Sequence, residues 1–266
     1  MTAPSGGRWG DLQTRVISAA VMLVVGAACI WLGGLPFAAL VVVLTGLMVW
    51  ELSRMIRPGH KRDAVWLAVL AATSLVTVLQ YGGGLSLPLL FITPLAMLFP
   101  AVPDRLRYGA YSGLIILASF GLVTLRDTSG VSAIVWLVGV VIVSDVSGYF
   151  AGRVLGGPKF WPAISPKKTW SGTIAGWVGA ALVGLGFVLI DGAGWGLVFF
   201  SPIVAFAGQM GDIAESWIKH RMRLKDSSHL LPGHGGVPAR FDALIGAVAA
   251  VLLLGLVLPL PLIAGH

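Results

Sequence analysis

Long apolar segments alternate with short polar ones along almost the whole chain. A helix needs about 20 apolar residues to cross a bilayer core, and most of these segments approach that length. Nine segments are distinguishable, at residues 16–34, 36–50, 64–80, 85–101, 110–124, 131–150, 172–190, 195–211 and 243–263. The pattern predicts an all-α fold, namely a polytopic integral membrane helix bundle of about nine transmembrane helices.

The composition agrees with this fold class and excludes an ordinary water-soluble domain. Hydrophobic residues make up 57% of the 266 residues and charged residues only 11%. The mean hydropathy is +0.91, whereas soluble domains carry about 25% charged residues. The single cysteine, Cys29, excludes an intrachain disulfide.

Basic residues are distributed asymmetrically among the polar segments. Of the 18 Lys and Arg residues, all except Arg126 precede the first apolar segment or follow the second, fourth, sixth or eighth. The positive-inside rule therefore assigns these polar segments to the cytoplasm. The net charge of +7 then lies on that face, where anionic lipid headgroups and nucleotides are the expected partners and nucleic acid is not.

Polar residues inside apolar segments divide the chain near residue 130. Residues 1–130, with about five spans, carry no carboxylate well inside an apolar segment and are interpreted as a transmembrane scaffold. Residues 131–266 carry ionisable side chains where the bilayer makes them costly, which indicates function. This C-terminal half, with its cytoplasmic polar loops, is the predicted catalytic region.

The first such side chain is Asp145, in VVIVSDVSGYFAGR. In a helix it shares a stripe with Tyr149 and Arg153, and Gly148 and Gly152 permit close helix contact. The spacing allows either a functional carboxylate or an interfacial one that pairs with Arg153.

The next polar segment, ISPKKTWSG, places Ser165, Lys167 and Lys168 in a cytoplasmic loop. These donors suit a phosphorylated ligand. A basic cluster that only fixes the membrane topology explains the lysines equally well.

A third motif, GQMGDIAESWIKHRMR, continues the eighth apolar segment. Continued helix would align Asp212, Glu215, Ser216, Lys219 and Arg223 in one polar stripe. Carboxylates at the membrane end and basic residues further out suit Mg²⁺ and phosphate groups. A solvated amphipathic extension is the alternative.

The last motif, KDSSHLLPGHGGVPARFD, combines ionisable residues with a glycine-containing turn. Adjacent glycines let backbone amides approach an anion without obstruction by a Cβ atom. The candidate residues are Lys225, Asp226, His234, Gly235, Gly236, Arg240 and Asp242.

The blocks DVSGYFAGR, ISPKKTW, GDIAESWIK, KDSSHLLPGHGG and RFD, in this order, resemble those of the CDP-diacylglycerol synthase (phosphatidate cytidylyltransferase) family. The resemblance covers residues 140–245. It implies transfer of CMP from CTP to phosphatidic acid, which gives CDP-diacylglycerol and pyrophosphate in phospholipid biosynthesis. It also implies a homodimer in a bacterial-type inner (plasma) membrane, with the active site facing the cytoplasm.

The resemblance further implies roles for individual residues. Asp145, Asp212 and Asp242 would hold Mg²⁺, with a second metal ion left open. The implied catalytic residues are Asp212, Lys219, Lys225, Asp226, His234 and Arg240. The implied substrate-binding residues are Ser165, Lys167, Lys168, Ser216, Gly235 and Gly236.

Three positions depart from the family pattern. Ala239 stands where Asp usually precedes the Arg, Ser171 where Glu commonly follows the Trp, and His220 where Arg is expected after the Lys. The missing carboxylate leaves open a catalytically weakened relative that binds lipid or nucleotide. A CTP-dependent enzyme acting on another lipid phosphate or a lipid alcohol is a further alternative. A transporter is disfavoured, because the polar residues gather at one face rather than at the midplane.

Overall fold

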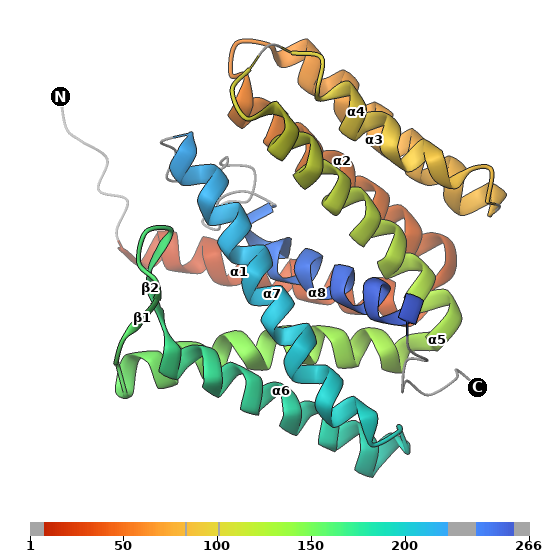
Figure 1. The fold of residues 1–266 in the computed structure, drawn as a ribbon. Coiled ribbons are helices and arrows are strands. Elements are labelled where there is room, and N and C mark those ends of the chain that lie inside the picture. The colour runs from red at the N-terminus through yellow and green to blue at the C-terminus, as the bar shows by residue number, and fades with distance from the viewer. Residues whose placement is uncertain (1–7, 83, 101, 223–237, 258–266) are drawn as a thin grey trace.

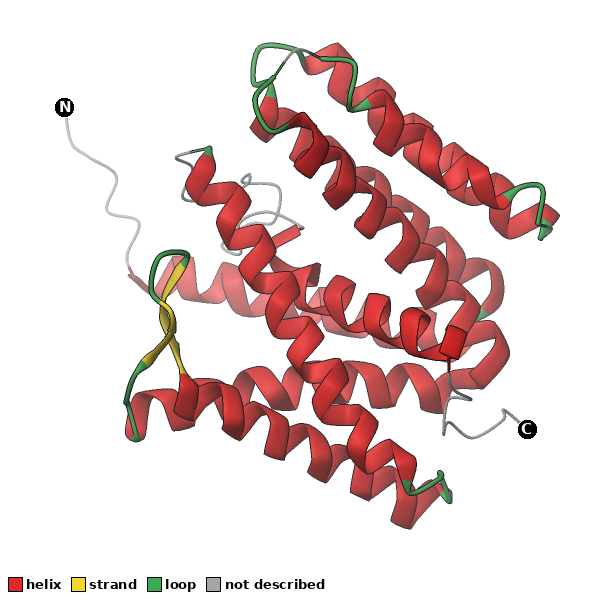
Figure 2. Ribbon diagram, viewed as in Figure 1, coloured by secondary structure: helices red, strands yellow, loops and turns green. Residues whose placement is uncertain are grey.

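The computed structural model describes residues 8–82, 84–100, 102–222 and 238–257. Within these ranges the chain forms a helix bundle and one short β-hairpin (Figure 1 and Figure 2). The elements are α1 (Arg8–Leu32), α2 (Gly34–Ile56), α3 (Lys61–Tyr81), the 3₁₀ helix η1 (Leu87–Phe91), α4 (Ile92–Ala96), α5 (Arg105–Val154), β1 (Lys159–Trp161), β2 (Ser165–Thr169), α6 (Trp170–Asp191), α7 (Gly196–Arg221) and α8 (Pro238–Val257). The predicted all-α membrane bundle is confirmed.

The predicted number of nine spans is not confirmed. Among the described residues, five helices are long and apolar enough to cross a membrane: α2, α3, α5, α6 and α7. The predicted span at 85–101 contains only η1 and α4, whose joint apolar length, Leu87–Ala96, is too short to cross. Pro88 and Pro94 lie in this segment and lack the backbone N–H that a longer helix would need.

Gly130 changes the direction of α5 between two predicted spans, 110–124 and 131–150. Its φ of 75° and ψ of −168° lie in a region that only glycine adopts readily. Figure 1 shows the two parts of α5 running in different directions on either side of this point. The first part packs beside α2, and the second part packs beside α6.

Two helix pairs approach one another closely enough to bring backbones into contact. A Cβ atom added to Gly211 of α7 would lie 2.2 Å from the carbonyl oxygen of Asp242 in α8. A Cβ atom added to Gly148 of α5 would lie 3.1 Å from the carbonyl oxygen of Gly172 in α6, and one at Gly152 would lie 2.9 Å from Thr169 Oγ1. The predicted close contact at Gly148 and Gly152 is therefore confirmed.

The ISPKKTWSG segment is not the irregular loop that was predicted. It contains β2, which pairs antiparallel with β1 and then leads directly into α6. Thr169 caps α6, because its side chain accepts a hydrogen bond from Gly172 N at 3.3 Å. The hairpin and the cap together fix where the lysines of β2 lie relative to the helices.

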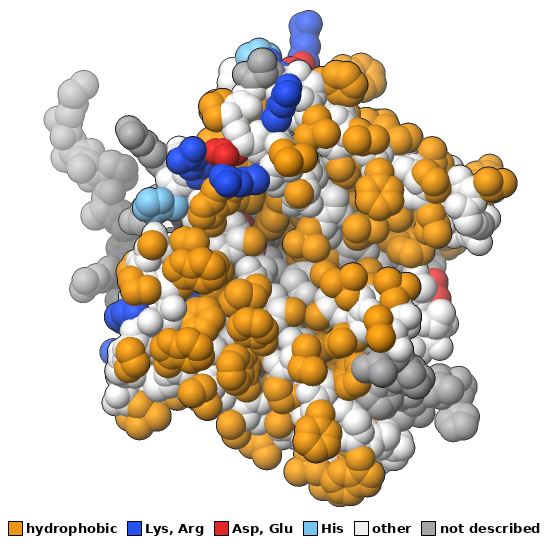
Figure 3. Space-filling view, viewed as in Figure 1, with side chains coloured by type: hydrophobic (Ala, Val, Ile, Leu, Met, Phe, Trp, Pro, Cys, Tyr) orange, Lys and Arg blue, Asp and Glu red, His pale blue; other side chains and the backbone are white. Residues whose placement is uncertain are grey.

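Most Lys and Arg side chains lie at one end of the bundle. On the face shown in Figure 3, Lys and Arg lie along the upper and left margins, and hydrophobic side chains cover the lower part. Arg126 lies at the opposite end, where its Nε donates to the carbonyl oxygen of Ile30 at 2.8 Å. This distribution follows the alternation of basic segments in the sequence.

Candidate active site

Three helices supply the carboxylates that were predicted to form a metal site. Asp145 lies on α5, Asp212 on α7 and Asp242 on α8. Asp242 and Asp145 each lie within electrostatic reach of Asp212. Residues separated by almost 100 positions thus come near one another because α7 packs between α6 and α8 while α5 packs against α6.

Lys168 joins the hairpin to these carboxylates. Its Nζ forms an ion pair with Asp212 Oδ2 and donates a hydrogen bond to the carbonyl oxygen of Gln209 at 3.3 Å. Asp145 also lies within electrostatic reach of Lys168. The alternative in which Asp145 pairs with Arg153 is not observed, because Arg153 Nη1 donates to the hydroxyl of Tyr149 at 2.8 Å.

Glu215 and Lys219 form a second ion pair one turn further along α7. Lys219 Nζ lies 2.6 Å from Glu215 Oε2, and the two side chains are only 17% and 5% exposed. A solvated amphipathic helix would expose both charges, so this alternative is wrong for Glu215. The other carboxylate oxygen, Oε1, has no hydrogen-bond partner among the described residues.

Gln209 of α7 contacts two neighbouring helices beside the candidate site. Its Nε2 lies 3.3 Å from Ser144 Oγ on α5 and 3.5 Å from the carbonyl oxygen of Thr173 on α6. These contacts tie α5, α6 and α7 together beside Asp145 and Asp212. The sequence interpretation missed Gln209, although an amide three residues before a functional carboxylate on one helix face is a detectable signal.

The remaining predicted residues divide into two groups. Ser165 and Ser216 are half-buried on β2 and α7, whereas Lys167 is exposed. Lys225, Asp226, His234, Gly235 and Gly236 lie outside the described residues, as does the side chain of Arg240 in the first turn of α8. Their predicted roles therefore stay predictions.

The carboxylates supply oxygen ligands of the kind that Mg²⁺ prefers. Two nearby ionised carboxyl groups repel one another unless a cation or a proton lies with them. The pair formed by the buried Asp242 and by Asp212, whose side chain is 37% exposed, therefore fits a divalent cation. Across the described ranges, however, no three His, Cys, Asp or Glu side chains converge as a ready set of ligands, so water and substrate phosphates would have to complete the shell.

Two side chains from the predicted scaffold lie against this site. Glu51 of α2 is fully buried, and its charge interacts with that of Glu215. Tyr111 of α5 is 6% exposed and interacts electrostatically with Glu215, Asp242 and Asp212. The sequence interpretation missed both residues, because Glu51 directly follows an apolar segment and Tyr111 lies inside one.

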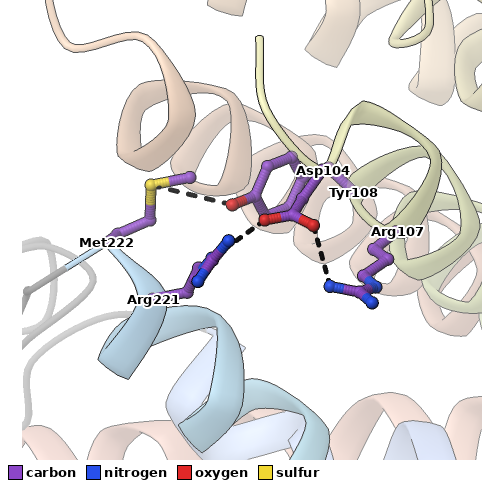
Figure 4. Close-up of polar contacts among 5 residues, drawn as sticks. All are labelled: Asp104, Arg107, Tyr108, Arg221 and Met222. Carbon is purple, nitrogen blue, oxygen red and sulfur yellow. Dashed lines mark hydrogen bonds and ion pairs between the residues drawn. The ribbon is translucent and has the colours of Figure 1, made fainter.

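A polar cluster holds the start of α5 against the end of α7, as Figure 4 shows. Asp104 accepts from Arg107 Nη1 at 2.8 Å and from Arg221 Nε at 2.9 Å. The hydroxyl of Tyr108 contacts Met222 Sδ at 3.8 Å. The cluster explains how the first turns of α5 are held beside the acidic stripe of α7.

Comparison with known proteins agrees with the family that the sequence blocks resemble. Residues 13–258 match the model of the Cytidylyltransferase family. The phosphatidate cytidylyltransferase of Brucella abortus is 35% identical over 265 residues, which cover 94% of this chain and 96% of that relative. The protein of the same name from Pseudomonas aeruginosa is 31% identical over 257 residues, covering 89% and 94%. A third, from Helicobacter pylori, is 39% identical over 137 residues, covering 51% and 50%.

Proposed function

Because the chain belongs to the cytidylyltransferase family, we propose that it transfers the cytidylyl group of CTP to phosphatidate, giving CDP-diacylglycerol and pyrophosphate. The observation that carries the proposal is that Asp212 is ion-paired with Lys168 and lies within electrostatic reach of Asp145 and Asp242, at the basic end of a membrane bundle. This arrangement suits one substrate that resides in the bilayer and one that arrives from water.

The reaction joins two anions. A phosphate oxygen of phosphatidate attacks the α-phosphorus of CTP and forms a new P–O bond. The bond from that phosphorus to the bridging oxygen breaks, and pyrophosphate leaves with the electron pair. Since the attacking phosphate is already ionised near neutral pH, the reaction needs no strong general base.

Lysines of the site offset the negative charge of the reactants. Lys168 and Lys219 each contact a carboxylate now, and each retains donors that can turn to a phosphate oxygen. Their ion pairs also hold the two ammonium groups in place before substrate binds. Lys168 comes from the hairpin and Lys219 from α7, so the two approach from different elements.

Mg²⁺ is proposed as the cofactor, held by Asp212 and Asp242 with Asp145 nearby. When bound, it would supply positive charge that offsets the repulsion between the two substrates and the charge on pyrophosphate. The electrostatic interaction between Asp212 and Asp242 supports this assignment. We also propose that the site faces the cytoplasm across an inner membrane and that the protein works as a homodimer.

Asp212→Asn tests the function directly. Purified protein in lipid vesicles should release pyrophosphate from CTP only with phosphatidate and Mg²⁺, and the variant should lose at least about 100-fold in rate. The matched control is Asp127→Asn, which removes an exposed carboxylate. Loss of rate in both variants, or lipid-independent release in the wild type, would contradict the proposal.

A further inference from the structure

The hydroxyl of Tyr111 is buried without a partner. The side chain lies in the first part of α5 and is 6% exposed, and its oxygen has no hydrogen-bond partner among the described residues. Burying a hydroxyl in this way costs free energy, and most buried polar groups in folded proteins are paired. Such an atom beside a functional site points to a ligand that pairs with it.

The surroundings of Tyr111 are the acidic residues of the candidate active site. Its hydroxyl lies within electrostatic reach of Glu215, Asp242 and Asp212. Glu215 Oε1 is also unpartnered, while Oε2 accepts from Lys219. Two unpartnered polar atoms, one donor and one acceptor, thus lie on the side of the site formed by α5 and α7.

The position of Tyr111 is fixed by contacts one turn away. Tyr108 contacts Met222, and Asp104 binds Arg221, so the start of α5 is joined to the end of α7 (Figure 4). Tyr111 follows Tyr108 by one helical turn, and its hydroxyl lies within electrostatic reach of Glu215. A side chain held in this way is preorganised for a ligand.

We propose that the Tyr111 hydroxyl donates a hydrogen bond to a phosphate oxygen of the bound substrate. The first part of α5, which the sequence assigned to a scaffold, would then complete the active site. A phosphate group is bound by hydrogen-bond donors, and the ionised carboxylates of Glu215, Asp212 and Asp242 can only accept hydrogen bonds. The site therefore needs a donor from another side chain. Tyrosine offers a donor without adding positive charge to the bundle. This inference rests on the proposed function.

Tyr111→Phe is the variant that tests it, because it removes only the oxygen. The matched control is Tyr81→Phe, which removes an exposed hydroxyl at the end of α3. Pyrophosphate release gives kcat and the KM for each substrate, CTP binding is measured alone, and thermal unfolding gives Tm for both variants.

Loss of a hydrogen bond to a charged group should lower kcat/KM about 10- to 100-fold in Tyr111→Phe, whereas Tyr81→Phe should change it less than about 2-fold. The Tm of Tyr111→Phe should stay constant or rise, since an unpaired hydroxyl leaves the core. A higher KM for phosphatidate with normal CTP binding would identify the lipid phosphate as the acceptor. Weaker CTP binding would identify the nucleotide, and a fall in kcat alone would identify a contact made only during transfer.

Two results would overturn the inference. Unchanged kinetic constants in Tyr111→Phe, beside an active wild type, would show that the hydroxyl touches no substrate. A lower Tm with unchanged kinetic constants would show a structural bond to Glu215 instead. An inactive wild type would contradict the proposed function itself, so the two failures are distinguishable.

Discussion

Lys167 and Lys168 are adjacent and chemically identical, yet they lie in different surroundings. Lys168 is 24% exposed and contacts Asp212 and the carbonyl oxygen of Gln209, whereas Lys167 is exposed. Neighbouring residues of a strand point to opposite faces, so β2 directs only one of them at the carboxylates. The sequence interpretation treated them alike because it predicted a loop there.

Exchanging each lysine for methionine separates their roles. Lys168→Met leaves Asp212 without its partner and removes a donor from the site, so kcat/KM should fall about 10- to 100-fold. Lys167→Met makes the same substitution at the neighbouring, exposed position, and it should alter kcat/KM less than about 3-fold. Steady-state pyrophosphate release measures both. Equal losses would indicate that the hairpin binds substrate through general positive charge.

A sequence indicates a functional role most clearly for a residue whose polarity differs from that of its neighbours. Asp145 and Asp212 stand out because a carboxylate near an apolar segment is costly and needs a reason. Glu51 follows an apolar segment directly, where a charge is ordinarily solvated, and nothing local shows that α2 ends in the bundle interior with Glu51 fully buried. Tyr111 is missed because a tyrosine within an apolar helix is common and does not stand out.

At the scale of elements, the spacing of the site depends on how closely helices approach. Gly211 and Gly246 bring α7 and α8 together, because a Cβ atom at either would lie 2.2 Å from a carbonyl oxygen of the other helix. This contact includes two residues of the candidate site. Asp212 follows Gly211 in the chain, and the carbonyl oxygen beside Gly211 belongs to Asp242. The sequence predicted a close helix contact at Gly148. It did not predict the one at Gly211, because the helix that faces Gly211 depends on the packing of the whole bundle.

Adding one methyl group to α7 should therefore disturb the site. Gly211→Ala forces α8 away from α7, with an expected cost of about 1–3 kcal/mol and a separation of Asp242 from Asp212 that lowers the rate. Gly186→Ala in α6 is the control, because a Cβ atom there meets nothing within 4 Å. Thermal unfolding should show lower stability, and pyrophosphate release a lower rate, for Gly211→Ala. Gly186→Ala should change neither. Normal behaviour of Gly211→Ala would mean that the two helices can adjust without moving the carboxylates.

Elements without strong periodicity were the least predictable. The hairpin has strands of three and five residues, too short for an alternating pattern to be recognised. Hydropathy could not distinguish a span from the short helices η1 and α4, since it averages over the prolines that end them. Gly130 separates two predicted spans, yet its positive φ is a property of the folded backbone.

For the whole molecule, the fold class follows from the composition, and the distribution of charge predicts an orientation in the membrane. An apolar chain satisfies its backbone in a bilayer by forming helices, so the bundle is dictated by physical chemistry before any packing is known. The basic residues then distinguish the two ends. Asp104, Arg107 and Arg221 strengthen one end through ion pairs, an arrangement that the count of positive charges did not predict.

The predicted orientation can be tested on the intact protein because the chain has one cysteine. In a Cys29→Ser background, Lys167→Cys and Asp127→Cys each introduce a thiol at an exposed position, near and far from the site. A membrane-impermeant maleimide should label Lys167→Cys only in inside-out vesicles and Asp127→Cys only in right-side-out ones, because the basic segments stay in the cytoplasm. Pyrophosphate release by each variant confirms that the labelled protein is folded. The reverse labelling would place Lys168 and Asp212 at the outer face, where CTP from the cytoplasm could not reach them.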